Sequence, residues 1–268
     1  MGYVLPYGQM SHWGCFDCLK CLFNNLFLLF LSLDEYTFHL FNFIYSDPYS
    51  LIMPLNAISK NLIRGIKRIG PHDKVVYSVI FGSLLGDAHA ERRNGGVGTR
   101  ISFQQEDIHV SYLLWLHNLL ALRGYCNENT PRVLTRLGHK GIVRKYSKFN
   151  TWTYTSFNFI HDLWYVNKVK IVPSTIKDYL TPLALAIWIM DDGAKVSKGI
   201  KLCTNSFTYS DCLLLVQVLY ENFGLKASVI SAGKINQYNI YLWKESMPNL
   251  RQICYSDIIP EMRYKIIE

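Results

Sequence analysis

The chain has 268 residues, of which 50% are hydrophobic and 14% aromatic, so it can bury a sizeable core and is not a disordered linker. Its seven cysteines are an odd number, which argues against a disulfide scaffold and fits a reducing compartment. The net charge of +8 is uneven: residues 1–55 hold one base and four acids, whereas residues 56–268 hold 27 bases and 16 acids. Such a basic folded part is typical of proteins that bind DNA, RNA or an anionic membrane surface.

An apolar stretch at residues 19–44 is prominent near the start of the chain. A membrane-spanning helix needs about 20 mostly apolar residues, but the cleanest run here covers only residues 26–33, between asparagines and acids. The stretch also lacks the basic start of a secretory signal and the Arg-rich pattern of a transit peptide. We therefore expect residues 15–70 to be an apolar leader with no stable membrane partner.

Residues 2–14, GYVLPYGQMSHWG, resemble a segment of cytochrome b, the mitochondrial membrane subunit of the respiratory chain. The resemblance stops at Cys15. That pattern is typical of an exon read in frame into an intron, so we expect residues 1–14 to be exon-derived. The resemblance implies a protein encoded by a mitochondrial cytochrome b intron and located in the mitochondrial matrix.

An internal repeat organises the rest of the chain. VVYSVIFGSLLGDA at 75–88 and LTPLALAIWIMDDG at 180–193 are both apolar helix candidates rich in small residues, and both reach an acid near their end. The elements expected after them are strand-like segments at 89–105 and 194–205, helices at 109–124 and 210–224, and strands at 132–137, 152–156, 227–231 and 238–243. The order helix, two strands, helix, two strands, helix thus appears twice. It predicts an α+β fold of two similar halves, residues 71–175 and 176–268.

The repeat also predicts a chemical site. Gly82 and Ala184 belong to runs of small residues, which allow two helix backbones to approach closely. If the two helices pack as pseudo-twofold partners, their ends bring Asp87 and Asp192 together. Adjacent carboxylates raise each other's pKa, and divalent cations such as Mg²⁺ prefer carboxylate, carbonyl and water oxygens. The pattern therefore indicates a metal site suited to phosphoryl chemistry.

FGSLLGDAH at 81–89 and LALAIWIMDDG at 183–193 resemble the two signature helices of the LAGLIDADG homing endonucleases, double-motif class. The resemblance covers residues 71–268. It implies two pseudo-symmetric αββαββα halves, with antiparallel saddle-shaped sheets that meet at the paired motif helices. The first motif ends in Asp-Ala rather than Asp-Gly.

The resemblance implies roles for individual residues. Asp87 and Asp192 would be the catalytic, metal-binding carboxylates, and the backbone carbonyls of the preceding residues, Gly86 and Asp191, would join them around Mg²⁺ or Mn²⁺. Lysines near the scissile phosphates would stabilise developing charge. Polar side chains on the second strand of each half would hold the attacking water. The lysines that match are Lys170 and Lys265, and the polar residues that match are Gln104 and Asn205.

The family reads DNA with one face of each sheet, in the major groove, where Arg, Lys, Gln and Asn recognise bases and phosphates. A segment at 138–148, which we expect to be a loop, contributes several of these bases. The candidates for DNA binding are Arg92, Arg93, Arg100, Arg132, Arg136, Lys140, Arg144, Lys195, Lys201, Lys234 and Gln237.

The resemblance implies a monomeric, metal-dependent endonuclease that cuts both strands of duplex DNA at an intronless cytochrome b allele. A second function stays open on the same residues: a maturase that binds its own group I intron RNA and assists splicing. Retained Asp87 and Asp192 favour the nuclease, because RNA binding alone requires no metal-binding carboxylates.

Overall fold

A computed structural model describes residues 67–92 and 96–267, which belong to one compact unit of the chain. The segment expected to be exon-derived, nearly all of the expected leader, and Arg93 lie outside the described residues. None of the helices in the described ranges is long and apolar enough to cross a membrane.

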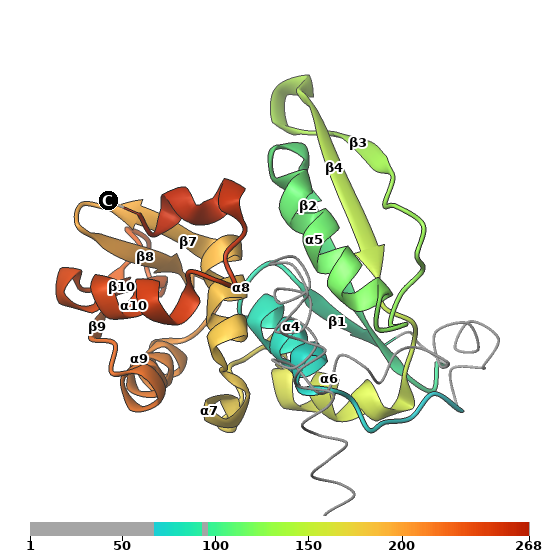
Figure 1. The fold of residues 1–268 in the computed structure, drawn as a ribbon, viewed down its shortest axis with the longest axis horizontal. Helices are drawn as coiled ribbons and strands as arrows, with labels where there is room; N and C mark the ends of the chain where they lie inside the picture. The colour runs from blue at the N-terminus through green and yellow to red at the C-terminus, as the bar shows by residue number, and fades with distance from the viewer. Residues whose placement is uncertain (1–66, 93–95, 268) are drawn as a thin grey trace, which may run out of the picture. The chain divides into compact units, whose positions relative to one another are not determined.

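The order of elements confirms the predicted repeat (Figure 1). The first half contains α4 (Lys74–Leu85), β1 (His89–Arg92), β2 (Thr99–Glu106), α5 (Val110–Ala121), β3 (Val133–Leu137), β4 (Val143–Asn150), α6 (Asn158–Trp164), β5 (Tyr165–Val166) and β6 (Val169–Lys170). The second half contains α7 (Ile176–Tyr179), α8 (Pro182–Asp192), β7 (Gly193–Val196), β8 (Gly199–Cys203), α9 (Tyr209–Phe223), β9 (Ala227–Ser231), β10 (Tyr238–Leu242) and α10 (Met247–Cys254). Short 3-10 helices connect these elements: η2 (Asp107–His109), η3 (His139–Gly141), η4 (Thr155–Phe157), η5 (Lys244–Ser246) and η6 (Pro260–Lys265).

Each half contains a four-stranded antiparallel sheet, with strand orders β1-β2-β4-β3 and β7-β8-β10-β9. In both sheets the first hairpin follows directly from a motif helix, so the end of that helix lies beside the sheet. The repeated strand order confirms the predicted α+β class and the antiparallel pairing. Local sequence also fixes helix starts: the Thr181 side chain accepts a hydrogen bond from Ala184 N, and Pro182 occupies the first turn of α8.

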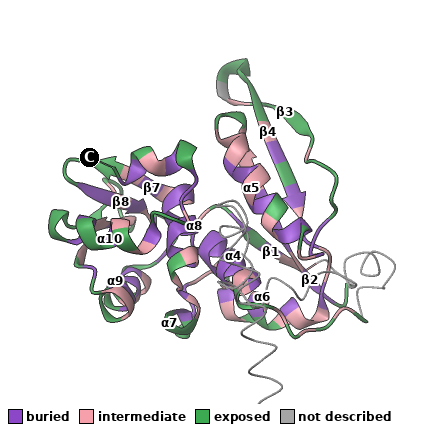
Figure 2. Cartoon of the chain, in the orientation of Figure 1, coloured by how far each residue is buried: buried purple, intermediate pink, exposed green. Residues whose placement is uncertain are grey.

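The core lies where α4 and α8 meet and continues under each sheet (Figure 2). Every residue of α8 from Ala184 to Met190 is buried, as is every residue of α4 from Ser78 to Leu85. Helices that are apolar on all sides are buried on all sides. Phe81 shows how the halves share this core: its ring stacks on Tyr179 at 3.9 Å between centroids and meets the edge of Trp164.

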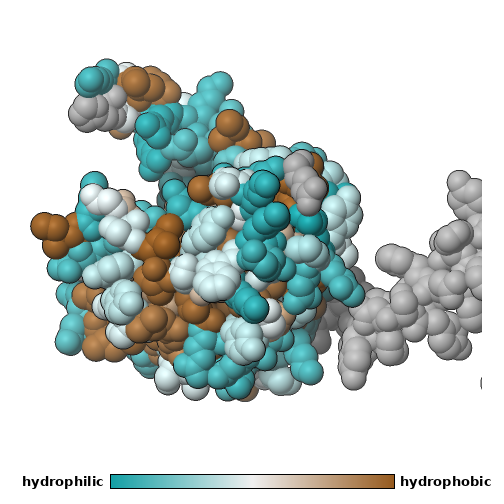
Figure 3. All heavy atoms as spheres, turned by 90° about the vertical axis from the view of Figure 1, so that its left-hand side faces the viewer, coloured by the Kyte–Doolittle hydropathy of each residue, from teal (hydrophilic) through white to brown (hydrophobic). Residues whose placement is uncertain are grey.

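The prediction for the last strand of the first sheet was wrong. Residues 152–156 form only an isolated bridge between Thr99 and Tyr154, followed by η4, while β4 occupies part of the segment expected as a basic loop. The first three residues of β4 and all of β3 are exposed. Because this hairpin extends beyond the core, no alternation of buried and exposed residues marks it in the sequence. Its tip stands clear of the rest of the chain and carries hydrophobic surface (Figure 3), including Leu137 and Ile142.

Candidate active site

Two glycines allow the motif helices to approach closely. A Cβ at Gly82 would lie 2.5 Å from the Ala184 carbonyl oxygen, and a Cβ at Gly86 would lie 2.5 Å from Asp191 Cβ. Both distances are shorter than any side chain tolerates, so these positions need glycine for steric reasons. The contact aligns the C-terminal ends of α4 and α8. It thereby brings acids 104 or 105 residues apart in the chain to one place.

The acids form a hydrogen-bonded cluster at the helix ends. Gln105 Nε2 donates to Asp87 Oδ2 at 2.8 Å and to Asp191 Oδ1 at 3.0 Å. Asp191 Oδ2 in turn accepts from the Asp87 backbone N–H at 3.4 Å. Asp87 is exposed, whereas Asp191 and Asp192 are partly buried. One amide thus orients carboxylates from both halves.

The surroundings oppose ionisation of the second-half acids. Burial, and next the Asp87 carboxylate, raises the pKa of Asp192 to about 7, despite the opposing effect of Lys170 and Lys265. Burial, followed by the charges of Asp87 and Asp192, also raises the pKa of Asp191 well above its usual value. Clustered carboxylates in a poorly solvated place are the electrostatic setting that a cation stabilises.

Lys170 and Lys265 reach this cluster from opposite halves. Lys170 Nζ donates to the carbonyls of Gly86 at 3.1 Å and Ala88 at 2.9 Å. Lys265, from η6, is 6% exposed and donates to the carbonyls of Ile189, at 3.2 Å, and Met190. Burial lowers the pKa of Lys170 to about 8, against the attraction of the Asp192, Asp191 and Asp87 carboxylates, and burial also lowers the pKa of Lys265. Both predicted lysines therefore lie beside the motif acids.

The oxygen atoms at this site are of the kind that binds a hard divalent cation. Asp87 and Asp192 offer carboxylate oxygens, and Gly86 and Asp191 offer backbone carbonyls that have two lone pairs each. No group of three or more His, Cys, Asp or Glu side chains in residues 67–92 and 96–267 is arranged to hold a metal by itself. The remaining ligands would have to come from water and from a bound phosphate, as in open catalytic metal sites.

The polar residues expected to hold water are not placed symmetrically. Strand pairing aligns the two halves, because His89 lies opposite Ser102 in the first sheet and Ala194 lies opposite Lys201 in the second. In this alignment Gln104 corresponds to Cys203, and Gln105 corresponds to Thr204. Asn205 was expected on the second strand of its half, but β8 ends at Cys203 and Asn205 lies in the following turn. The strand ends there because the Thr204 side chain bonds to the Tyr238 carbonyl and the chain turns toward α9.

Gln105 is the site residue that sequence reasoning missed. Side chains alternate along β2, and Ile101 and Phe103 are buried on the face that packs against the helices. Gln105 continues that face at the end of the strand, so its amide points to the acids rather than to the open side of the sheet. The signal available in the sequence was a polar residue, Gln105, at the two-residue spacing that continues the buried positions Ile101 and Phe103.

No helix of the described residues covers the opposite face of either sheet. In the first half it carries Arg100, Gln104, Lys148, Arg144 and Arg136, which pairing places on one side. Three of these bases are ion-paired: Arg100 with Glu91 at 2.6 Å, and Arg136 and Arg144 with Glu106 at 3.2 and 2.9 Å. The corresponding face in the second half carries Lys201 beside Tyr241, Asn239 and Ile230.

Several predicted DNA-binding residues lie elsewhere. Arg132 precedes β3 and is exposed, Lys140 lies in the β3–β4 connection, and Lys234 and Gln237 lie in the β9–β10 connection. Arg92 lies on the helix-covered face and pairs with Asp162 of α6 at 3.0 Å. Lys195 pairs with buried Ile200, and its Nζ donates to the Ile267 carbonyl at 2.8 Å. We expected Arg92 and Lys195 on the face of the sheet that reads DNA. This was wrong, because both side chains lie on the same face of their sheet as buried core residues.

Comparisons of sequence and structure relate this chain to known proteins. The sequence profile described as the LAGLIDADG DNA endonuclease family matches residues 77–250. The chain is 44% identical, over a 292-residue alignment covering 99% of this chain and 69% of the relative, to cytochrome b mRNA maturase bI2 of Saccharomyces cerevisiae. It is 48% identical to the protein of the same name from Debaryomyces hansenii, covering 73% of this chain and 75% of that one.

A shorter match and a solved structure add to this. The chain is 35% identical to intron-encoded endonuclease ai4 of Dictyostelium discoideum, over 53% of this chain and 92% of that protein. Its fold is similar to that of the homing endonuclease I-WcaI bound to its DNA recognition sequence, with a TM-score of 0.66. That match has 21% identity and covers 81% of this chain and 96% of the other, so it identifies the fold.

Proposed function

Because this chain belongs to the LAGLIDADG DNA endonuclease family, we propose that it is a site-specific endonuclease that hydrolyses one phosphodiester bond in each strand of duplex DNA. The observation that carries the proposal is the meeting of Asp87 and Asp192 at the ends of paired helices, with a buried lysine from each half beside them. Duplicated acids and lysines suit a substrate with two antiparallel strands, since each half would serve one strand.

In this proposal Asp87 and Asp192, with the carbonyls of Gly86 and Asp191, hold divalent metal, either Mg²⁺ or Mn²⁺. A metal bound there would acidify a water and neutralise charge on the scissile phosphate. Gln105 fixes the orientation of the Asp87 carboxylate through its 2.8 Å bond. Lys170 and Lys265 supply positive charge close to the phosphates and stabilise the charge that develops during hydrolysis. Gln104 lies on the open face, away from the acids, so we assign it to contact with the bound substrate, whereas Asn205 keeps the proposed role of holding the attacking water.

The open sheet faces would bind the DNA. We propose that phosphate and base contacts come from Arg100, Arg132, Arg136, Lys140, Arg144, Lys201, Lys234 and Gln237. The ion pairs of Arg100, Arg136 and Arg144 with Glu91 and Glu106 are partly exposed, so they cost little to exchange for phosphate contacts.

The proposed target is an intronless cytochrome b allele, cut by a monomer in the mitochondrial matrix. Support comes from the relatives named for cytochrome b mRNA and from the likeness of residues 2–14 to cytochrome b. A second function, binding of the chain's own intron RNA to assist splicing, is favoured by one observation: both of those relatives are named maturases.

The test is cleavage of a duplex that spans the cytochrome b exon junction after the codon for Gly14. We expect the full chain to cut both strands with Mg²⁺ and not with EDTA, while D87N and D192N lose at least about a hundredfold in rate and keep their affinity for the duplex. An unchanged rate in both variants would contradict the proposal. Binding of intron RNA with no effect on the duplex would leave the maturase function in its place.

A further inference from the structure

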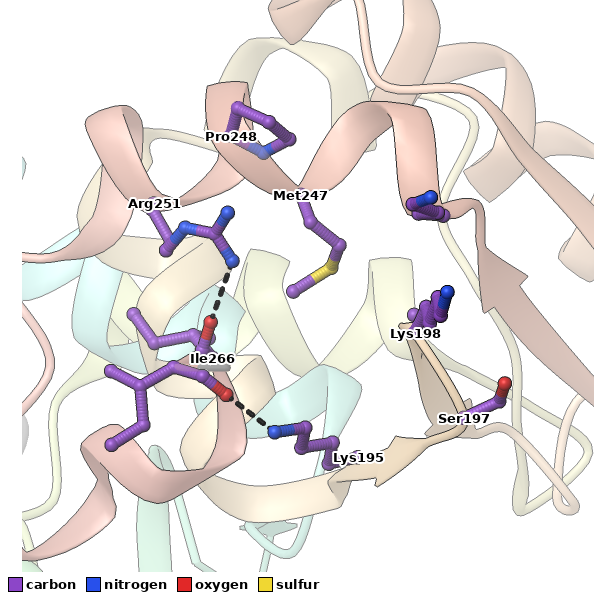
Figure 4. Close-up of a pocket in the computed structure, with 10 residues that line it drawn as sticks. Lys195, Ser197, Lys198, Met247, Pro248, Arg251 and Ile266 are labelled. Carbon is purple, nitrogen blue, oxygen red and sulfur yellow. Dashed lines mark hydrogen bonds between the residues drawn. The ribbon is translucent and has the colours of Figure 1, made fainter.

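A cavity in the second half is lined by bases that the proposed cleavage site does not use (Figure 4). Its volume is about 450 Å³, and its walls come from the β7–β8 turn, the start of α10 and the last residues of the described chain. Lys195, Lys198, Lys244 and Arg251 line it, together with apolar groups such as Met247 and Ile267. None of the described residues that line it is acidic.

The cavity does not belong to the open sheet face. Strand pairing places Lys195 opposite buried Ile200, on the side of the sheet that the helices cover. Lys198 lies in the turn between β7 and β8, and Lys244 lies in η5, beyond the end of β10. A duplex held against Lys201 and Tyr241 on the open face would therefore contact a different surface.

The charge of the cavity differs from that of the first-half sheet. There Arg100 is paired with Glu91, and Arg136 and Arg144 share Glu106. In the cavity, by contrast, neither Lys198 nor Lys244 has an ion pair with any described residue. Lys195 and Arg251 donate to the carbonyls of Ile267 and Ile266, at 2.8 and 3.2 Å, which holds both side chains at the wall. A hollow lined by one sign of charge focuses its field on an incoming anion.

We propose that this cavity binds phosphate groups of a nucleic acid backbone at a second surface, separate from the open sheet faces. The inference rests on the proposed nucleic-acid function. Phosphodiester oxygens accept hydrogen bonds from lysine and arginine with little sequence preference. Apolar Met247 and Ile267 at the same wall give a sugar a surface to pack against. Since the open faces are assigned to duplex DNA, and two relatives are named mRNA maturases, we assign the cavity to RNA.

The test compares two variants of equal charge change in the full chain. K198Q/K244Q removes the two cavity lysines that have no ion pair with a described residue, and K74Q/K168Q removes two exposed lysines of the first half. Two probes are used in binding titrations between 50 and 200 mM salt: a transcript of the cytochrome b intron, and the exon-junction duplex. For the cavity variant we expect RNA affinity to fall about tenfold and the salt slope, log K against log salt, to flatten by about 1.4 to 1.8. We expect duplex affinity to stay within about twofold, as in the control variant.

Equal losses of RNA and duplex affinity in the cavity variant would overturn the separate surface, because the same phosphates would then belong to the cleavage complex. Matching RNA affinities in the cavity and control variants would overturn the phosphate site altogether. Melting curves of both variants establish that each is folded. Cleavage by the unchanged chain tests the proposed endonuclease independently, so the two failures are distinguishable.

Discussion

At the scale of single residues, the site depends on which face of β2 a glutamine occupies. Gln104 and Gln105 are neighbours in sequence, yet alternation along the strand sends their side chains to opposite faces. Gln105 bonds to Asp87 and Asp191 across the two halves. Gln104 shares the open face with Lys148 and Ser102. One therefore acts on the carboxylates, and the other is available to substrate.

Substitutions of the two glutamines should affect different quantities, since only Gln105 bonds to the acids: the cleavage rate depends on Gln105, and contact with the duplex involves Gln104. Gln105→Met keeps the size of the side chain but removes the donor that orients Asp87, so we expect cleavage to slow by about tenfold to a hundredfold with unchanged duplex affinity. Gln104→Met is the matched variant on the open face. Single-turnover rates and binding titrations measure both effects. A slower rate in Gln104→Met and a normal one in Gln105→Met would restore Gln104 as the residue that acts at the acids.

At the scale of elements, the approach of α4 and α8 is limited by backbone rather than by side chains. The group nearest to Gly82 is the Ala184 carbonyl, which cannot swing away. The residue after Gly82 is Ser83, and its hydroxyl is buried and has no hydrogen-bond partner among the described residues. Adjacent positions on one helix thus have opposite requirements: one admits no added atom, and the other carries a polar atom that its environment does not satisfy.

This contrast predicts opposite effects of alanine at adjacent positions. Gly82→Ala gains about 1 kcal/mol of helix propensity, but the collision outweighs that gain, and we expect a net loss of about 1–3 kcal/mol in the free energy of unfolding. Ser83→Ala removes a buried unsatisfied hydroxyl, and we expect a gain of about 1 kcal/mol. Urea denaturation measures both values. An unchanged free energy of unfolding in Gly82→Ala would mean that the helices can separate at no cost.

Most elements could be predicted from the sequence because their burial leaves a periodic pattern. The motif helices, α5, α9 and the strands β9 and β10 all lie against the core. The exposed β3–β4 hairpin could not be predicted, because its strands are specified by pairing with each other. The motif acids followed from the internal repeat, and the two lysines followed from the family resemblance. The predicted places of Lys195 and Asn205 were wrong. A shift of one residue along a strand moves a side chain to the other face of the sheet, as for Lys195, and Asn205 lies in a turn outside the sheet.

At the scale of the whole molecule, the halves share one core instead of packing as separate domains. Phe81 from the first half is fully buried and stacks on Tyr179 of the second. The Thr181 hydroxyl of the second half donates to the Ser78 hydroxyl of the first at 2.7 Å. Neither half can unfold without exposing the apolar surface of α4 or α8.

We therefore expect one cooperative unfolding transition. Phe81→Ala should cost about 3–5 kcal/mol and should move the whole transition to lower temperature, although the substituted residue belongs to the first half. Calorimetry checks this, because calorimetric and van't Hoff enthalpies agree for a single transition. Leu213→Ala, on an exposed side of α9, is the control with little effect. Two transitions, of which only one moves in Phe81→Ala, would contradict a shared core.

The contact between Gly86 and Asp191 has a consequence for engineering and for the history of the gene. These residues occupy equivalent positions in the two motifs, one before Asp87 and one before Asp192, and they face each other. A protein built from two copies of the first half would oppose glycine to glycine and leave a gap, and one built from two copies of the second would oppose two aspartates. The halves are thus no longer interchangeable modules. A change at either position is acceptable only if the other accommodates it, so the two halves of this gene must evolve as a pair.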